Sequence, residues 1–375
     1  MQIAEHFDKP SHVGRILIIQ LGDIGDVVWS LPALQAVREA YPGATIAVLL
    51  REGTGALLAA DILPPEIFEV RKGQGGFFGN LSASLRLVRA LRRKRFDLVF
   101  DLRGDERGGY MAFLTGAPVR AAQYYPGLSW LRNHMFTHLT PLSDGDPKER
   151  AAGPCLAILR AFEIETGSAV PELRLSEQVR LRAAKILAEE GILPAAETTH
   201  GGMSAHSPAG SPCGWATVNP FSRWSYKEWR PEKWVRIIDW LRQEFGIAAV
   251  IVGSPAERGR AGELALGCLG TVYNLAGRTT LAELAGALER SRLHVGVDSA
   301  APHIAAAVGT PTVTLYGPSD WRYWAPPGER HRVAVSDMDC VPCDKKGCEG
   351  GGVSRCLNNL EVVRVQAVLR EALSG

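Results

Sequence analysis

Two polar clusters in the sequence stand where an apolar strand pattern gives way to a helical pattern. In the stretch VGVDSAAPHIAAAVGTP, Asp298 and Ser299 directly follow the strand pattern, and His303 comes one helical turn later. Helix amino termini at the carboxyl ends of strands bind anions and nucleotides in α/β proteins. The alternative interpretation is an ordinary turn with a helix N-cap and a hydrogen-bonded core histidine.

The second cluster lies near the amino terminus, where the apolar run RILIIQL is followed by GDIGD and a helical pattern up to Tyr41. Asp26 stands at the junction of this loop and the helix. Held above a sheet by a tight turn, its carboxylate would serve as a general base facing a ligand. Its alternative role is a helix N-cap, which contributes ~1 kcal/mol. Asp23 is the weaker candidate for either role. The glycines do not follow GxGxxG, so the dinucleotide fingerprint is absent.

The elements that must position these residues alternate between strand and helix in both halves of the chain. Strands are predicted over 44–50, 66–70, 96–102, 118–123, 216–220, 248–253, 293–298, 312–317 and 331–336. Helices are predicted over 81–95, 107–115, 149–166, 177–190, 231–245 and 360–373. Continuous apolar strands between helices are typical of parallel sheets that are covered on both faces, so we expect an α/β fold.

Length and composition limit the class of protein. The 375 residues suffice for two domains with cores of their own. No apolar run approaches ~20 residues. The first fifteen residues contain acids and no apolar core, so no secretory signal is predicted and a cytoplasmic protein is expected. A net charge of +2 gives no indication of a nucleic-acid partner.

Four segments together resemble the ADP-heptose:lipopolysaccharide heptosyltransferases, the inverting sugar transferases of glycosyltransferase family 9. In the family's order they are GDIGDVVWSLPAL, NPFSRWSYKEWRPEKW, VGVDSAAPHIAAAVGTPTVTLYGPSD and the cysteine-rich tail from Cys340. The resemblance implies a GT-B fold, in which two Rossmann-like domains face each other across a cleft. The domains implied are an acceptor-binding domain over 1–175, an interdomain helix and flexible linker over 176–214, a donor domain over 215–358, and a helix over 359–375 that packs back on the first domain.

The resemblance also implies roles for single residues. Asp26 corresponds to the general base, and Lys227, in a K-x-W pattern, to the cation that neutralises the donor diphosphate. The implied donor contacts are Ser222, Arg223, Asp298, Ser299 and His303 near the diphosphate, Glu257 at the ribose, and Thr279 and Leu281 near the adenine. No cofactor is required for catalysis in the family. The chain departs from the family pattern before the first Gly-Asp pair and at Arg230, which interrupts a Trp-Pro step.

The reaction implied by the resemblance is transfer of L-glycero-D-manno-heptose from ADP-heptose to the inner core of lipopolysaccharide. The acceptor would be a Kdo or heptose residue carried on lipid A. Alternatives are another nucleotide sugar as donor, or a protein acceptor of the autotransporter class. A nicotinamide oxidoreductase is disfavoured because the dinucleotide fingerprint is missing.

A strongly basic stretch precedes the third predicted strand. Between Val70 and Phe96 there are eight basic residues and no acid, and the loop GQGGFFGN lies within it. We expect Arg92, Arg93 and Arg95 to contact an anionic acceptor, and the stretch to contact the inner-membrane surface, where each base contributes ~1 kcal/mol. The alternative is a solvated helix face beside a loop.

The last candidate site is a group of cysteines spaced C-x2-C-x4-C-x7-C. Cys340, Cys343, Cys348 and Cys356 have the ligand count of a tetrahedral zinc or iron site. Such a site would be structural, because four thiolates leave no position open for a substrate. The alternative is four reduced thiols in an irregular segment.

Overall fold

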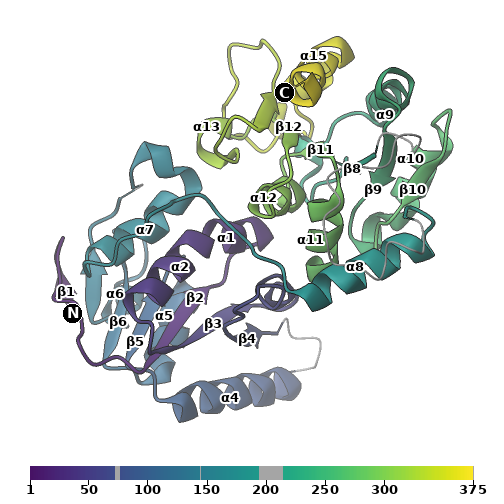
Figure 1. Ribbon diagram of the computed structural model, residues 1–375. Coiled ribbons are helices and arrows are strands. Elements are labelled where there is room, and N and C mark those ends of the chain that lie inside the picture. The colour runs from purple at the N-terminus through teal and green to yellow at the C-terminus, as the bar shows by residue number, and fades with distance from the viewer. Residues whose placement is uncertain (72–76, 144, 194–213, 375) are drawn as a thin grey trace. The chain divides into compact units, whose positions relative to one another are not determined.

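Two compact units make up the chain, Met1–Pro171 and Glu172–Gly375. The computed structural model describes residues 1–71, 77–143, 145–193 and 214–374, and no side chains for 77–81 (Figure 1). The division lies close to the predicted domain boundary at residue 175. The predicted interdomain helix and linker over 176–214 is described only in part, because residues 194–213 lie outside what is described, as do the side chains of Phe77 and Phe78 in the loop GQGGFFGN.

Within its described residues, the first unit contains a seven-stranded parallel sheet in the order β1-β7-β6-β5-β2-β3-β4. The strands are β1 Gln2–Ile3, β2 Arg15–Gln20, β3 Thr45–Arg51, β4 Glu66–Val70, β5 Leu98–Asp101, β6 Val119–Gln123 and β7 His138–Thr140. The helices are α1 Ile24–Trp29, α2 Leu31–Ala40, α3 Gly55–Leu58, α4 Phe77–Lys94, α5 Glu106–Thr115, α6 Trp130–His134 and α7 Gly153–Arg160, with a 3₁₀ turn at Pro147–Ala152. The side chains of β2 from Ile16 to Ile19 are buried, as the continuous apolar run predicts.

The described part of the second unit contains a six-stranded parallel sheet in the order β10-β9-β8-β11-β12-β13. Its strands are β8 Trp215–Asn219, β9 Ala248–Ile251, β10 Val272–Asn274, β11 Leu293–Val297, β12 Thr312–Leu315 and β13 His331–Ala334. Its helices are α8 Glu177–Glu189, α9 Pro231–Phe245, α10 Arg258–Leu266, α11 Leu281–Arg290, α12 Ala300–Ala307, α13 Trp321–Trp324, α14 Arg355–Asn359 and α15 Val362–Ser374. Short 3₁₀ turns lie at Ser225–Lys227, Pro255–Glu257 and Cys348–Gly350. Two Rossmann-like parallel-sheet units are the architecture of the GT-B class, which confirms the predicted fold.

The strand order reverses once in each sheet, and these two places position the candidate site residues. In the first unit the chain builds outward from β2 to β4 and then restarts on the other side with β5. In the second unit it builds from β8 to β10 and restarts with β11. At such a reversal the connections leave in opposite directions, which opens a crevice at the carboxyl ends of the two central strands.

Helix α9 illustrates how closely local sequence signals set an element. Pro231 occupies its first turn, Gly246 ends it with a φ of 65°, and both bounds match the prediction. Trp234, Ile237 and Leu241 recur at helical spacing and are buried in the core of the second unit.

The prediction was wrong for the single helix over 149–166. A kink at Arg150, with a φ of 52°, lies inside the 3₁₀ turn, and α7 begins only at Gly153 and ends at Arg160. Pro154 lies in the first turn of α7, where its missing N–H favours the start of a new helix.

Two elements at the domain borders belong to the second unit. Helix α8 lies against α11, where a Cβ at Gly286 would come 2.6 Å from Cβ of Ala183. Helix α15 buries Val365 and Leu369 in the same core as α9. Its predicted packing on the first domain stays a prediction.

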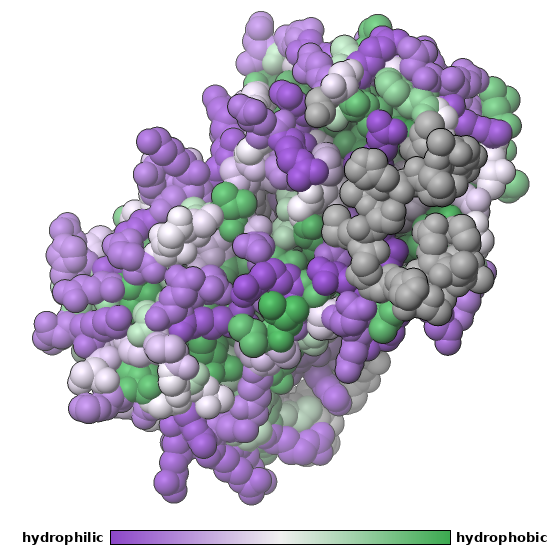
Figure 2. Space-filling model, in the orientation of Figure 1, coloured by the Kyte–Doolittle hydropathy of each residue, from purple (hydrophilic) through white to green (hydrophobic). Residues whose placement is uncertain are grey.

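Hydrophilic residues cover most of the face shown in Figure 2, and apolar residues gather there in small groups. No helix within the described residues combines the length and the apolar character needed to cross a bilayer.

A buried histidine in β11 makes the stability of the second unit pH-dependent. His294 is completely buried, and its Nδ1 lies 2.9 Å from Oγ1 of Thr217. Burial, and to a smaller extent the neighbouring His303, lower the pKa of His294 to about 3. The unfolded chain, with a histidine pKa of about 6.5, therefore binds a proton that the folded chain rejects.

We expect the free energy of unfolding to fall by up to about 1.4 kcal/mol per pH unit for this group as the pH drops from about 6.5 toward 3. The change His294→Gln removes this contribution, so the difference between wild type and variant should shrink progressively below pH 6.5. Urea unfolding followed by tryptophan fluorescence at several pH values measures it. Parallel pH profiles for the two proteins would contradict the assignment.

Candidate functional site

In the first unit, a tight turn after β2 holds the carboxylate of Asp26. Asp23 is the N-cap of α1, so the predicted alternative role of Asp26 as the N-cap is wrong. Asp26 is instead the third helical residue, and its Oδ2 accepts the backbone N–H of Asp23 at 2.7 Å in a capping box. A Cβ at Gly22 would lie 2.4 Å from Oδ2 of Asp26, so only glycine fits there. The segment GDIGD thus fixes the position of the Asp26 carboxylate.

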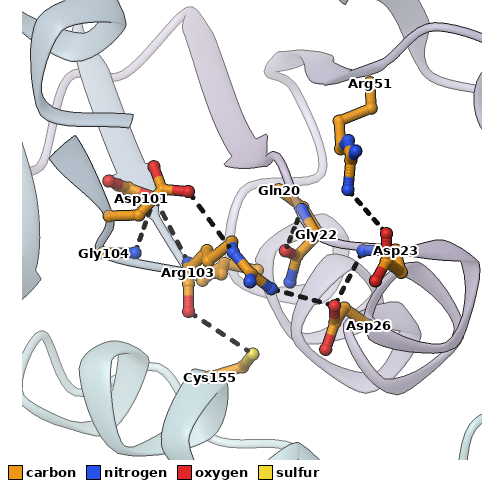
Figure 3. A network of polar contacts seen from close by, with 11 residues as sticks. Gln20, Gly22, Asp23, Asp26, Arg51, Asp101, Arg103, Gly104 and Cys155 are labelled. Atoms are coloured by element: carbon orange, nitrogen blue, oxygen red, sulfur yellow. Dashed lines mark hydrogen bonds and ion pairs between the residues drawn. The ribbon is translucent and has the colours of Figure 1, made fainter. Parts of the chain in front are cut away.

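Two arginines from neighbouring strands neutralise this turn (Figure 3). Arg51, the last residue of β3, pairs with Oδ1 of Asp23 at 2.5 Å. Arg103, two residues after β5, places Nη1 2.9 Å from Oδ2 of Asp26. Both donors to Asp26 reach Oδ2, and no described residue donates to Oδ1. One oxygen of a partly exposed, ion-paired carboxylate is therefore available to a ligand.

The loop that carries Arg103 is held from below by Asp101, the last residue of β5. Its Oδ1 accepts the backbone N–H groups of Arg103 at 3.2 Å and Gly104 at 3.0 Å (Figure 3). Burial raises the pKa of Asp101 to about 7, against the hydrogen bond from Gly104 and the charge of Arg132, which lower it. Gly104 has a φ of 73°, and a Cβ there would lie 2.8 Å from Nη2 of Arg132. The backbone beneath Arg103 has little freedom to move.

In the second unit, Lys227 and Asp298 meet at the strand-order reversal. Lys227 follows β8, Asp298 follows β11, and Nζ lies 2.6 Å from Oδ2. Asp298 is only 7% exposed and the lysine side chain 22%, so the pair is shielded from water on most sides. Ser299 is the N-cap of α12. Its buried Oγ has no hydrogen-bond partner among the described residues. A cation, a helix amino terminus and an unpaired hydroxyl thus lie together, a combination suited to an anion.

The other predicted donor residues lie along the same carboxyl edge of the second sheet. His303 is buried in α12, close enough to affect the pKa of His294. Ser222 donates its N–H to Glu228, and the guanidinium of Arg223 lies 5.0 Å from the ring centre of Trp224.

The residues predicted to contact the nucleoside follow β9 and β10. Glu257 forms a capping box, accepting the N–H of Ser254 at 2.6 Å. Thr279 and Leu281 flank Thr280, the N-cap of α11. Because β9 lies beside β8 and β10 is the edge strand beyond it, these predicted residues lie between the reversal and the edge of the sheet.

The predicted acceptor-binding arginines are exposed on and after α4. Arg92 and Arg93 lie in its last turn, and Arg95 follows with a φ of 51°. Lys94 instead pairs with Glu66 of β4 at 2.5 Å. The arginines therefore present positive charge to solvent, which fits both the ligand-binding and the solvated-face interpretations.

The predicted zinc or iron site has no support in the structure. Cys340 is exposed and Cys356 is buried, and no group of three or more candidate ligands within the described residues is placed to hold a metal ion. Burial raises the pKa of Cys356. Cys343 and Cys348 are half-buried, and Cys348 accepts the N–H of Arg355 at 3.4 Å. Within the described residues these four cysteines form no disulfide.

Sequence reasoning missed Arg103. The residue sits in LRGDERGG directly after a predicted strand, which is where ligand-facing residues of α/β sheets occur. The available signal was its position, but only the observed order places β5 next to β2 and brings Arg103 to Asp26.

Comparison with known proteins agrees with this architecture. Residues 84–353 match the family model of glycosyltransferase family 9 (heptosyltransferase). The chain is 27% identical to lipopolysaccharide heptosyltransferase 3 of Escherichia coli over an alignment of 310 residues. This alignment covers 80% of this chain and 83% of that protein.

Two solved structures resemble the whole chain. A family 9 glycosyltransferase from Veillonella parvula superposes with a TM-score of 0.79 at 21% identity, covering 99% of this chain and 100% of that one. The E. coli ADP-heptose LPS heptosyltransferase II superposes with a TM-score of 0.72 at 21% identity, and the superposition covers 96% of this chain and 98% of that one. With its motifs, its two parallel sheets and the match over most of its length, the chain belongs to glycosyltransferase family 9, the heptosyltransferases.

Proposed function

We propose that this glycosyltransferase moves heptose from ADP-heptose to the inner core of lipopolysaccharide on lipid A. The observation that carries the proposal is the placement of Lys227 beside the amino terminus of α12 at the reversal of the second sheet, where a diphosphate would meet a cation and a helix dipole. The names of the relatives, lipopolysaccharide heptosyltransferases, support the donor and the acceptor. A protein acceptor remains the alternative, and lipid and polypeptide acceptors assayed side by side distinguish the two.

In the proposed mechanism the first unit binds the acceptor and Asp26 is the general base. Oδ1 takes the proton of the acceptor hydroxyl while the hydroxyl oxygen attacks the anomeric carbon of the heptose. The bond from that carbon to the diphosphate oxygen breaks, its electron pair leaves with ADP, and the configuration inverts. Arg103 holds Oδ2 and so directs Oδ1 at the acceptor.

The second unit is proposed to bind the donor and to stabilise the departing ADP. Lys227, Arg223 and the amino terminus of α12 neutralise the charge that develops on the diphosphate. Ser299 and His303 are close to the phosphate oxygens in this arrangement, Asp298 orients Lys227, and Ser222 supports the upstream loop. Glu257 binds the ribose, and Thr279 and Leu281 contact the adenine. Heptosyltransferases need no cofactor for catalysis, and these groups act in place of a divalent ion.

The acceptor is proposed to reach the enzyme from the inner-membrane surface. Arg92, Arg93 and Arg95 would contact its anionic groups, which keeps a cytoplasmic enzyme in peripheral contact with anionic lipid. Reversing all three to glutamate should weaken binding to anionic vesicles.

Loss of the base should slow chemistry without weakening donor binding. For Asp26→Asn we expect kcat to fall about 10²–10⁴-fold, with the KM for ADP-heptose within about twofold of wild type. ADP release in the presence of truncated lipopolysaccharide measures this. The matched control is Asp23→Asn, which keeps an N-cap oxygen and should lose far less activity. If Asp23→Asn proved the more damaging change, the roles of the two residues would have to be exchanged.

Removing the positive charge of Lys227 should weaken binding of the nucleotide donor. For Lys227→Met we expect ADP affinity, measured by calorimetry, to fall about tenfold or more, because a charged hydrogen bond to phosphate is lost and Asp298 is left unpaired. Lys346→Met, an exposed lysine of the tail, should bind ADP as wild type does. EDTA should leave transfer unchanged, and activity abolished by EDTA would contradict the metal-free mechanism.

Arg103 should affect turnover through the orientation of Asp26. We expect Arg103→Gln to lower kcat about tenfold or more at unchanged ADP affinity, since one charge-assisted hydrogen bond to the base is lost. Arg51→Gln, which unpairs Asp23 instead, is the control and should have the smaller effect. Equal losses would mean that both arginines simply stabilise the turn.

A further inference from the structure

Three large aromatic side chains of the first unit are exposed to solvent on two adjacent short helices. Phe113 of α5 is 53% exposed and Trp130 of α6 is 72% exposed. Tyr110 and Leu131 complete this group, called the aromatic patch below. Among the described residues only one other aromatic side chain, Trp224, is classed as exposed. Aromatic exposure is therefore concentrated at one place, which is unusual for a surface that faces only water.

Packing of the two helices holds these side chains toward solvent. On α5, Gly108, Gly109 and Ala112 face the interior, which turns Tyr110 and Phe113 outward. A Cβ at Gly109 would lie 3.2 Å from Cγ of Arg132, so α5 and α6 touch.

Arg132 attaches α6 to the interior of the first unit. It is completely buried, and its Nη1 donates to the carbonyl of Gln123 at 2.8 Å and to Oδ1 of Asn133 at 2.7 Å. The exposure of Trp130 and Leu131 is thus built into the packing of the helix.

The surroundings of the aromatic patch are basic. Arg107 is exposed on α5. The half-buried Arg120 lies 5.7 Å from the ring centre of Phe113 and donates to the carbonyls of Met135 and Ala117, so it adds positive charge near the patch while its Nε and Nη1 are already engaged. A Cβ at Gly116, which ends α5, would lie 3.8 Å from Nε of Arg92. The nearby acids are engaged in the first turn of α5, since Asp105 caps Gly108 and Glu106 accepts the N–H of Ser129.

We propose that the aromatic patch docks on an anionic lipid bilayer, with Trp130 and Phe113 inserted at the level of the headgroups. Exposed tryptophan, tyrosine and phenylalanine ringed by arginine suit the bilayer interface, where the rings enter the apolar boundary and the guanidinium groups meet lipid phosphates. A second copy of the chain fits less well, because a symmetric contact through the patch would bring the same arginines together. The inference rests on the proposed function for its purpose, a lipid-borne acceptor, but binding to a bilayer requires no catalysis.

The test is flotation of the full chain with vesicles of phosphatidylglycerol and phosphatidylcholine, with pure phosphatidylcholine vesicles in a second arm. The variant Trp130→Ser/Phe113→Ser should partition to the anionic vesicles about tenfold or more weakly than wild type, because the rings no longer leave water. The matched control is Leu266→Ser/Leu269→Ser, whose side chains are 88% and 82% exposed in the second unit. It should bind as wild type does.

Further readouts separate docking from folding and from catalysis. Thermal unfolding and transfer to a water-soluble, deacylated acceptor should be unchanged in the Trp130→Ser/Phe113→Ser variant, whereas transfer to acceptor in vesicles should fall. Equal vesicle binding by wild type and this variant would overturn the proposal. So would a self-association, detected by sedimentation, that the variant loses while vesicle binding stays. A wild-type protein that binds vesicles yet transfers no heptose would refute the proposed function and leave the docking surface intact.

Discussion

In both units, one carboxylate meets one cation where the order of a parallel sheet reverses. Asp26 and Arg103 follow β2 and β5, and Lys227 and Asp298 follow β8 and β11. In parallel sheets, neighbouring connections diverge at such a reversal, which is why ligand-binding residues are expected there. In the proposed function the two ion pairs differ in which partner meets the ligand. The first unit would present an oxygen of Asp26, and the second would present the ammonium group of Lys227 beside a helix amino terminus.

The precision of the first pair depends on backbone geometry rather than on a deep core. Asp26 is held by a capping box and needs the absence of a side chain at Gly22. Arg103 depends on a loop whose amides bind Asp101 and whose turn at Gly104 has a positive φ. These are local constraints on each side of the contact. Together they fix the distance between two side chains that are far apart in the sequence.

The sequence predicts most element bounds and the positions of single site residues, but not the contacts between residues that are far apart along the chain. The bounds of α9 follow from Pro231 and Gly246, and the positions of Asp26 and Asp298 after apolar strands follow from residue pattern. The ion pairs of Asp26 with Arg103 and of Lys227 with Asp298 join residues 77 and 71 positions apart, so they depend on strand order, which periodicity does not encode. Cysteine spacing supplies a ligand count but not the direction of the thiols. The kink at Arg150 escaped prediction because the helical pattern continues across it.

The ion pair of Lys227 and Asp298 has a consequence for turnover. The carboxylate of Asp298 is only 7% exposed and already pairs with the ammonium group, so in the proposed mechanism an incoming diphosphate would compete with an internal anion for the same positive charge. Under that mechanism the competition would lower the affinity for the nucleotide, product included, and the return of Lys227 to Asp298 would favour release of ADP. The ion pair also means that neither Lys227 nor Asp298 is an uncompensated charge in the fold.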